Sequence, residues 1–347
     1  MPGSRLGSQL GSKLGSLFRL LRHSPILRPF IILIGCVVLF AAVDGSQFRF
    51  LSLGTLRSTL QSFATLAPIA LGLGLAMLAR EFDLSIAGLF GLAGCVAVLT
   101  GVDYPLLGLL AAVAVGLAVG VIQGVIIVRL RLGSVAVTLG GLLICTGIAL
   151  VISNNQVIGY ANTDMALMLG DYLFGLFTWR SIVAIAIIAV VSVLFALTRI
   201  GRDIVAIGSN REAAVTTGVP VSAILIGVFG FSGALTALSG GLVSFSLASA
   251  SPTGLSDVLV PAAAAAILGG VSLSGGTGRP LSIALGVLVL SVLRAGVNAI
   301  GAPPFVNDLA IGTILLAVAI ADGPELMRRF TEIASALQYL ANRRSLK

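Results

Sequence analysis

The chain has 347 residues, of which 57% are hydrophobic and only 10% are charged, and its mean hydropathy is +1.11. Soluble domains carry about 25% charged residues, so this composition excludes a water-soluble protein and indicates one embedded in a bilayer. The net charge is +8. Because the basic side chains lie in short segments between apolar stretches, the charge favours a role in membrane orientation over nucleic-acid binding.

Apolar segments follow one another along the whole chain, and a membrane helix needs about 20 such residues. Ten are expected, over approximately 26–43, 60–79, 86–101, 104–128, 134–152, 181–198, 221–243, 256–270, 281–299 and 305–321. The short segment 86–101 is expected to belong to a broken helix. We therefore predict an all-α integral membrane protein of about ten transmembrane helices, with its transmembrane domain over 26–321, a basic N-terminal tail over 1–25 and a C-terminal tail over 322–347.

The loop charges predict how these helices are oriented. If the N-terminus is cytoplasmic, 17 of the 21 Lys and Arg residues lie on the cytoplasmic side and three on the other. This bias predicts that both termini are cytoplasmic. The longest external loop is then 153–180, where Trp179, beside Arg180, is expected to anchor the chain at the membrane interface. The longest internal loop is 199–220.

A faint internal echo relates the two halves of the chain. The segment 82–85 (Phe-Asp-Leu-Ser) and the segment 271–275 (Val-Ser-Leu-Ser-Gly) occupy comparable places. Two halves of five helices each have opposite orientations, because five is odd. We therefore predict two inverted five-helix halves, the plan of many transporters.

The internal loop 199–220 carries the signals of a short helix. Asn210 is a good N-cap, and Glu212 places a carboxylate in the first turn, where it suits the helix dipole. Gly218 is placed to end the helix and Pro220 prevents its continuation. Two interpretations remain open, an ordinary polar loop and a helix that docks into a groove on a cytoplasmic partner.

Several polar side chains lie close to membrane depth. Arg294 and Asp308 either face a cavity or extend to the interface. Asp83 is expected to pair with Arg80 or with a neighbouring backbone group. Asn298 and Asn307 either bond across helices or offer hydrogen bonds to a hydroxylated solute.

Signals for catalysis and cofactor binding are weak. The glycine-rich loop 269–278 lacks the Lys-Ser/Thr ending of a phosphate-binding loop, so we expect irregular backbone between helices and no bound ATP. The segment 230–233 superficially resembles an intramembrane protease motif, but the single histidine, His23, lies in the N-terminal tail. Ser232 and Gly233 are therefore expected to be packing residues. We predict no catalytic residue, no metal site and no cofactor.

The segment 199–220 also resembles the coupling loop of bacterial ABC importer permeases, in particular the ribose-type branch that serves monosaccharides and autoinducer-2. Motifs similar to that branch continue in order along about two-thirds of the chain, at 83–85, 137–140, 248–253, 267–276, 296–301 and 304–305. Carried over by position, the resemblance implies that a coupling helix is formed by Asn210, Glu212, Ala213, Ala214 and Gly218.

The resemblance implies a permease subunit of the bacterial inner membrane that moves a small hydroxylated solute by alternating access. Its implied partners are two cytoplasmic ATP-binding subunits, a periplasmic solute-binding protein and a second permease, either identical or different. We place along the translocation path Asp83, Ser85, Ser251, Asn298 and Asn307. The alternative is a secondary transporter driven by an ion gradient, which would need several buried acidic residues.

Four departures from the family pattern leave the solute open. Arg80 and Glu81 stand where the family has two glycines, and Ser134 and Val135 replace a Pro-Phe pair. An acidic pair is replaced within 259–261, and two asparagines are replaced at 294–295.

Overall fold

The computed structural model describes residues 26–45, 48–254, 256–317 and 320. The predicted tails over 1–25 and 322–347 lie outside the described residues. Within the described ranges, each of the predicted apolar segments forms a helix, which confirms the all-α class.

The elements follow one another with short connections, and several helices begin at recognisable caps. Thr178 and Ser181 form a capping box at the start of α8, and Pro105 occupies the first turn of α5. The elements are α2 (Leu27–Asp44), α3 (Leu53–Leu78), α4 (Ile86–Thr100), α5 (Pro105–Leu130), α6 (Ser134–Ile152), β1 (Ile158–Gly159), α7 (Thr163–Gly170), α8 (Trp179–Leu197), α9 (Arg199–Ser209), α10 (Arg211–Thr216), α11 (Val221–Ser246), β2 (Ser249–Ala250), η2 (Ser256–Val258), α12 (Leu259–Leu268), α13 (Pro280–Ala299) and the helix Phe305–Ala317.

Not all of these helices are long enough to cross a bilayer alone. Among the described residues, seven helices have the length and composition of a membrane span, namely α2, α3, α5, α6, α8, α11 and α13. The apolar helices α4, α12 and Phe305–Ala317 are shorter. The short segment expected near 86–101 is therefore confirmed as α4, while the count of ten spans stays a prediction.

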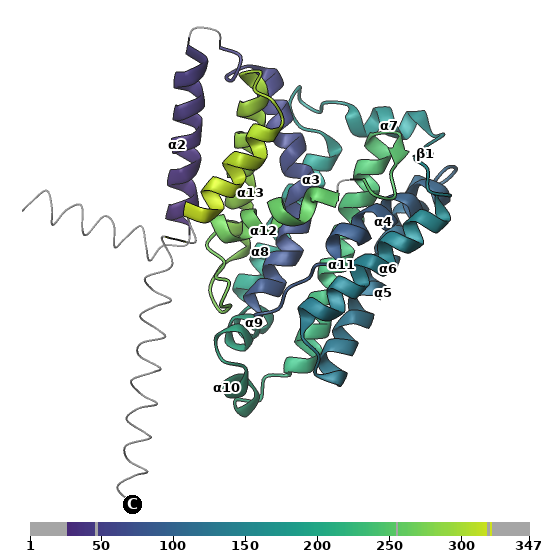
Figure 1. The fold of residues 1–347 in the computed structure, drawn as a ribbon, viewed down its shortest axis with the longest axis vertical. Helices are drawn as coiled ribbons and strands as arrows, with labels where there is room; N and C mark the ends of the chain where they lie inside the picture. The colour runs from purple at the N-terminus through teal and green to yellow at the C-terminus, as the bar shows by residue number, and fades with distance from the viewer. Residues whose placement is uncertain (1–25, 46–47, 255, 318–319, 321–347) are drawn as a thin grey trace, which may run out of the picture. The chain divides into compact units, whose positions relative to one another are not determined.

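The helices α3 and α11 lie at the centre of the part of the chain that ends at Pro303. The helix α11 packs against α5, α4 and α3, and α3 packs also against α13, α8 and α12 (Figure 1). The contact of α5 with α11 depends on glycine, since a Cβ on Gly116 would lie 2.3 Å from the carbonyl oxygen of Gly233. Small residues let helix backbones approach closely inside a membrane, where packing drives association. Gly233 is thus the packing residue that the sequence predicts.

The two long loops lie at opposite ends of this helix bundle, as predicted. The segment 153–178 contains α7 and β1, and β1 pairs antiparallel with β2 through Ile158–Ala250 and Gly159–Ser249. The helices α9 and α10 lie at the other end (Figure 1).

Arg180, the neighbour of the predicted anchor Trp179, makes contacts within the helix bundle. Its guanidinium donates hydrogen bonds to the hydroxyls of Ser246 in α11 and Thr65 in α3. Both partners are distant in sequence, so the pattern of residues around Trp179 could not reveal them. Arg180 therefore ties α8 to the two central helices.

The described residues from Pro304 onward belong to a separate unit. Its described helix is Phe305–Ala317.

Candidate functional site

The helix α10 begins as the sequence predicts. The Asn210 side chain accepts a hydrogen bond from the backbone N–H of Ala213 at 3.0 Å. Glu212 lies in the first turn of the helix, where its negative charge is favourable. The N-cap assignment is confirmed.

The end of α10 is equally well defined. Gly218 has a φ of +81°, the left-handed conformation that glycine adopts without a steric penalty. The N–H of Gly218 donates to the carbonyl of Val215, and the N–H of Val219 donates to that of Ala214, both at 3.0 Å. This is a Schellman motif, which satisfies carbonyls at a helix end. α10 is therefore a single short helix with both ends fixed by hydrogen bonds.

Most of α10 faces outward. Ala214 is buried, while Glu212, Ala213 and Val215 are exposed, as are Thr216, Thr217 and Gly218. Because Ala214 is the one buried residue of this helix, most of its surface is free to contact another protein.

The preceding helix α9 sits closely on the end of α3. Its buried side includes Ile204, Ile207 and Gly208. A Cβ on Gly208 would lie 1.8 Å from the carbonyl oxygen of Leu78, so only glycine fits there. The same Leu78 carbonyl accepts a hydrogen bond from the N–H of Gly276 at 2.9 Å. The last turn of α3, α9 and the glycine-rich loop thus meet through backbone contacts, which is the irregular backbone predicted for residues 269–278.

A salt bridge connects α10 to the segment that follows this end of α3. The guanidinium of Arg211 pairs with the carboxylate of Glu81. Glu81 is 9% exposed and Arg211 is 49% exposed. The pair therefore joins a nearly buried acid to a base at the surface.

The end of α3 explains one departure from the family pattern. Arg80 has a φ of +64°, and its N–H donates to the Met77 carbonyl while the N–H of Glu81 donates to that of Ala76. This is again a Schellman motif, with arginine at the position where glycine is usual. The structure therefore keeps the backbone shape that a glycine would give, and its side chains differ.

Between α3 and α4 the chain is irregular, and α6 satisfies its backbone groups. The N–H of Phe82 donates to the Ser134 hydroxyl and the N–H of Leu84 donates to the Thr138 hydroxyl, both at 3.1 Å. Unpaired backbone groups at membrane depth cost several kcal/mol each. These two side chains therefore allow the break between α3 and α4.

Asp83 is the most buried acidic residue of this break, with 1% of its surface exposed. One carboxylate oxygen accepts hydrogen bonds from the Ser85 N–H at 3.1 Å and the Ser85 hydroxyl at 2.6 Å. The other accepts from the Ser232 hydroxyl at 2.8 Å. The expectation of a neighbouring backbone partner is confirmed, and Ser232, expected only as a packing residue, is a hydrogen-bond donor as well.

Gln123 of α5 lies beside this cluster. It is 5% exposed, and neither of its amide atoms has a hydrogen-bond partner among the described residues. A Cβ on Gly141 would lie 2.2 Å from its amide nitrogen and 3.4 Å from the Cβ of Ser85. The polar centre of this region therefore consists of Asp83, Ser85, Ser232 and Gln123.

The internal echo seen in the sequence has a structural counterpart. At 272–274 the Ser272 hydroxyl accepts from the Ser274 N–H at 3.2 Å and lies 2.7 Å from the Ser274 hydroxyl. Asp83 and Ser85 are joined in the same way. Each segment follows a helix that ends in a Schellman motif, since Gly270 at the end of α12 has a φ of +83° and donates to Ile267. The local similarity is thus real, while the inversion of whole halves stays a prediction.

Within the part of the chain that ends at Pro303, the predicted path residues lie on different elements. Asp83 and Ser85 are in direct contact, whereas the Ser251 carbonyl lies over Gly91 of α4, 3.4 Å from where a Cβ would stand. Asn298 is exposed, and so is Arg294 one turn earlier on α13.

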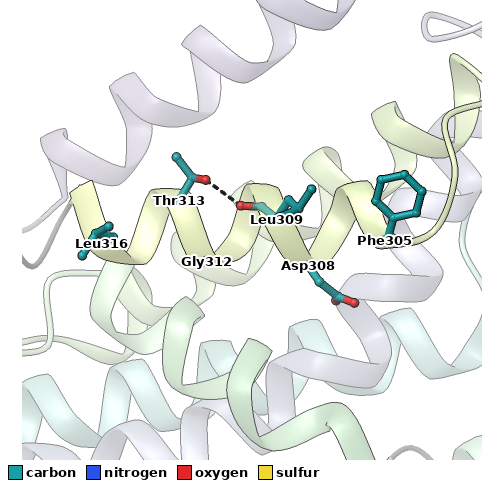
Figure 2. A pocket seen from close by; sticks show the side chains of 6 residues that line it. All are labelled: Phe305, Asp308, Leu309, Gly312, Thr313 and Leu316. Atoms are coloured by element: carbon teal, nitrogen blue, oxygen red, sulfur yellow. Dashed lines mark hydrogen bonds between the residues drawn. The ribbon is translucent and has the colours of Figure 1, made fainter.

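The remaining predicted polar residues belong to the unit that begins at Pro304. Asn307 is buried and its side-chain oxygen has no partner among the described residues, whereas Asp308 is exposed. An open groove runs along the helix Phe305–Ala317, and the Thr313 hydroxyl donates to the Leu309 carbonyl at 2.7 Å (Figure 2). The groove is lined by Phe305, Asp308, Leu309, Gly312, Thr313 and Leu316.

Some residues around the break between α3 and α4 were not identified from the sequence. Ser134 and Thr138 had a signal, since hydroxyl side chains one turn apart near a helix start can bond neighbouring backbone. Gln123 was detectable as an amide within a long apolar segment. Glu81 and Arg211 carried no local signal of their pairing, because their partners are 130 positions apart.

Comparisons with known proteins agree with the resemblance in the sequence. Residues 55–319 match a family described as the permease component of the branched-chain amino acid transport system. The chain is 32% identical to the ribose import permease protein RbsC of Escherichia coli K12 over 296 residues, which cover 84% of this chain and 92% of the relative.

Two further relatives carry other solute names. The L-arabinose ABC transporter permease protein AraH of Azospirillum brasilense is 28% identical over 311 residues, covering 88% of this chain and 89% of the relative. The autoinducer 2 import system permease protein LsrC of Escherichia coli O9:H4 is 30% identical over 298 residues, covering 84% and 85%. No solved structure matches the chain significantly.

Proposed function

We propose, because this chain belongs to the family described as the permease component of the branched-chain amino acid transport system, that α10 is the helix through which a separate ATPase drives transport. The chain is a permease subunit of an ABC importer and a multi-pass protein of the bacterial inner membrane. Proteins of this family are non-catalytic membrane subunits, and ATP hydrolysis belongs in our proposal to a partner.

The observation that carries this proposal is the combination of exposure and fixed geometry in α10. Its N-cap and Schellman motif fix both ends, and one small residue, Ala214, is buried. Its base, α9, is seated on α3, a central helix. A short, exposed helix on a rigid seat suits insertion into a groove of a partner. We assign this coupling role to Asn210, Glu212, Ala213, Ala214 and Gly218.

The proposed assembly has two cytoplasmic ATP-binding subunits, a periplasmic solute-binding protein and a second permease subunit, identical or different. The loop charges support an orientation with α9, α10 and both termini on the cytoplasmic side. The repeated turn at Asp83 and Ser272 supports two inverted five-helix halves. Closure of the ATPase pair would tilt the permeases, and differential binding to the two states would supply the work.

We propose that the solute is a monosaccharide or a similar hydroxylated molecule. The family description names branched-chain amino acids, but the three relatives carry the names of ribose, arabinose and autoinducer-2. Full-length relatives at about 30% identity are the more specific guide. The proposed path residues are Asp83, Ser85, Ser251, Asn298 and Asn307.

An ion-driven transporter is less well supported. Among the described residues, the buried acidic side chains are Asp44, Glu81 and Asp83. Each already has a partner, since Asp44 accepts from the Phe50 N–H at 2.8 Å, Glu81 pairs with Arg211, and Asp83 accepts from two serines. An ion-binding carboxylate would need free coordination sites.

Deletion of residues 210–218, or Glu212→Lys, tests the coupling role. Each variant should insert into the membrane normally but lose ATP-driven uptake of radiolabelled ribose and arabinose in vesicles containing the ATPase and the binding protein. The deletion removes the surface that the ATPase pushes, and Glu212→Lys reverses a charge on that surface. Undiminished uptake after the deletion would refute the assignment.

The control is Asp171→Lys in the loop at the opposite end of the bundle. Asp171 is exposed, like Glu212. This variant makes the same change of charge away from α10, so its uptake should match that of the unaltered protein.

A further inference from the structure

The salt bridge of Glu81 with Arg211 joins the exposed helix α10 to the segment that follows α3. Arg211 is the first residue of α10, and Glu81 lies three residues after Leu78, the last residue of α3. The Glu81 backbone is fixed, since its N–H donates to the Ala76 carbonyl at 2.9 Å. The acid is therefore held in place, and the base belongs to the exposed helix.

Glu81 leads directly into the irregular segment between α3 and α4. The next residues are bonded to two other helices, because Phe82 and Leu84 donate to hydroxyls of α6, and Asp83 accepts from Ser232 of α11. A displacement of Glu81 would therefore act on a segment that contacts α6 and α11 together.

The attachment of α10 to the body is otherwise slight. Ala214 is its one buried residue, and the side chains of Glu212, Val215, Thr216 and Thr217 are exposed. Arg211, through its salt bridge with Glu81, thus adds a side-chain contact between α10 and the segment that follows α3. Movement of α10 relative to α3 would stretch or release this contact.

The Glu81–Arg211 salt bridge is expected to contribute little to the stability of the folded protein. A salt bridge with one half-exposed partner gains modest attraction and is screened by salt. An acid that is nearly buried, however, is costly when its partner is removed. The pair is therefore suited to hold one geometry of α10 against α3 and to penalise others.

We propose that the Glu81–Arg211 salt bridge is the joint that transmits movement of α10 to the broken segment 81–85, and through it to α6 and α11. The two residues are positioning residues, since neither is placed on the solute path. The proposal rests on the proposed function, in which a partner ATPase moves α10. It adds the contact by which that movement enters the membrane domain.

Charge reversal tests the joint. The variants are Glu81→Arg, Arg211→Glu and the double reversal, each assembled with the ATPase and the binding protein in vesicles. Uptake of radiolabelled ribose or arabinose, whichever the unaltered complex accumulates more, and ATP hydrolysis are measured on the same vesicles. Each single reversal should lower solute moved per ATP by about fivefold or more, and the double reversal should restore it to within about twofold.

Two further measurements separate the joint from simple structural damage. The amount of ATPase that copurifies with each variant shows whether α10 still docks, and the melting temperature in detergent shows whether the fold is intact. The amount of copurified ATPase should stay near that of the unaltered complex. The melting temperature should fall in the single reversals, where a nearly buried charge loses its partner, but each variant should stay folded at the temperature of the uptake assay. Arg202→Glu, an exposed position on α9, changes the charge of the same loop without touching the pair and should couple normally.

The results distinguish the two proposals. If the unaltered complex couples uptake to ATP but the single reversals do so equally well, the joint is refuted and the proposed function stands. The joint is also refuted if the double reversal is as defective as the worse single variant. If the unaltered complex takes up none of the relatives' solutes with ATP, both proposals fall.

Discussion

At the scale of single residues, the end of α3 holds an unusual backbone conformation. Arg80 has a φ of +64° and an exposed side chain. The left-handed conformation costs about 1–2 kcal/mol for a residue with a Cβ. Its Schellman hydrogen bonds, from the N–H groups of Arg80 and Glu81, nevertheless keep the turn in place.

Replacing Arg80 by glycine should relieve this cost. Arg80→Gly is expected to raise the stability of the purified protein by about 1 kcal/mol, because glycine adopts the turn without a clash. Arg80→Ala is the matched control, since alanine removes the charge but keeps the Cβ, and it should give no such gain. The melting temperature in detergent measures both, and equal shifts for the two variants would contradict the explanation.

Residues with nearby partners were predictable from the sequence, and residues with distant partners were not. The cap at Asn210 needs only the three residues that follow it, so its residue type was sufficient. Asp83 and Ser232 are 149 positions apart, and their contact depends on how α3 and α11 pack. The turn at Asp83 and Ser85 was visible as an echo, whereas its bond to α11 was not.

At the scale of elements, the seat of α9 on α3 is the closest backbone contact near the candidate site. Gly208 faces the Leu78 carbonyl with no room for a side chain, and the N–H of Gly276 bonds to the same carbonyl. Three elements therefore meet at the end of one central helix. The hydrophobic pattern predicted these elements, but glycine content alone did not indicate which glycines lie between backbones.

A single methyl group at Gly208 should disturb this contact. Gly208→Ala is expected to destabilise the protein by about 1–3 kcal/mol, because the new Cβ overlaps the Leu78 carbonyl oxygen and forces the helices apart. The melting temperature in detergent and the yield of assembled complex report the effect.

The matched control is another helical glycine. Gly227 of α11 has nothing within 4 Å of the position that a Cβ would take. Gly227→Ala should be neutral or slightly stabilising, because alanine favours a helix by up to about 1 kcal/mol over glycine. A loss of stability equal to that of Gly208→Ala would argue against the steric explanation.

At the scale of the whole molecule, composition and charge predicted the membrane environment better than the residues of the translocation path. The apolar segments all form helices, and the long loops at 153–180 and 199–220 lie at opposite ends of the bundle. The orientation of the termini and the inversion of two halves stay predictions. The assignment of the path residues stays a prediction, because a motif retains its residue types without indicating which of them face solute.

The central claim is that nucleotide hydrolysis by a partner, acting on α10, moves solute through this chain. The most direct measurement compares two vesicle preparations, with radiolabelled ribose or arabinose added to the external solution of each. One holds the chain with its ATPase and binding protein, and the other holds the purified chain alone under a proton or sodium gradient. We expect accumulation only in the first, dependent on ATP and on residues 210–218; accumulation in the second would contradict the account.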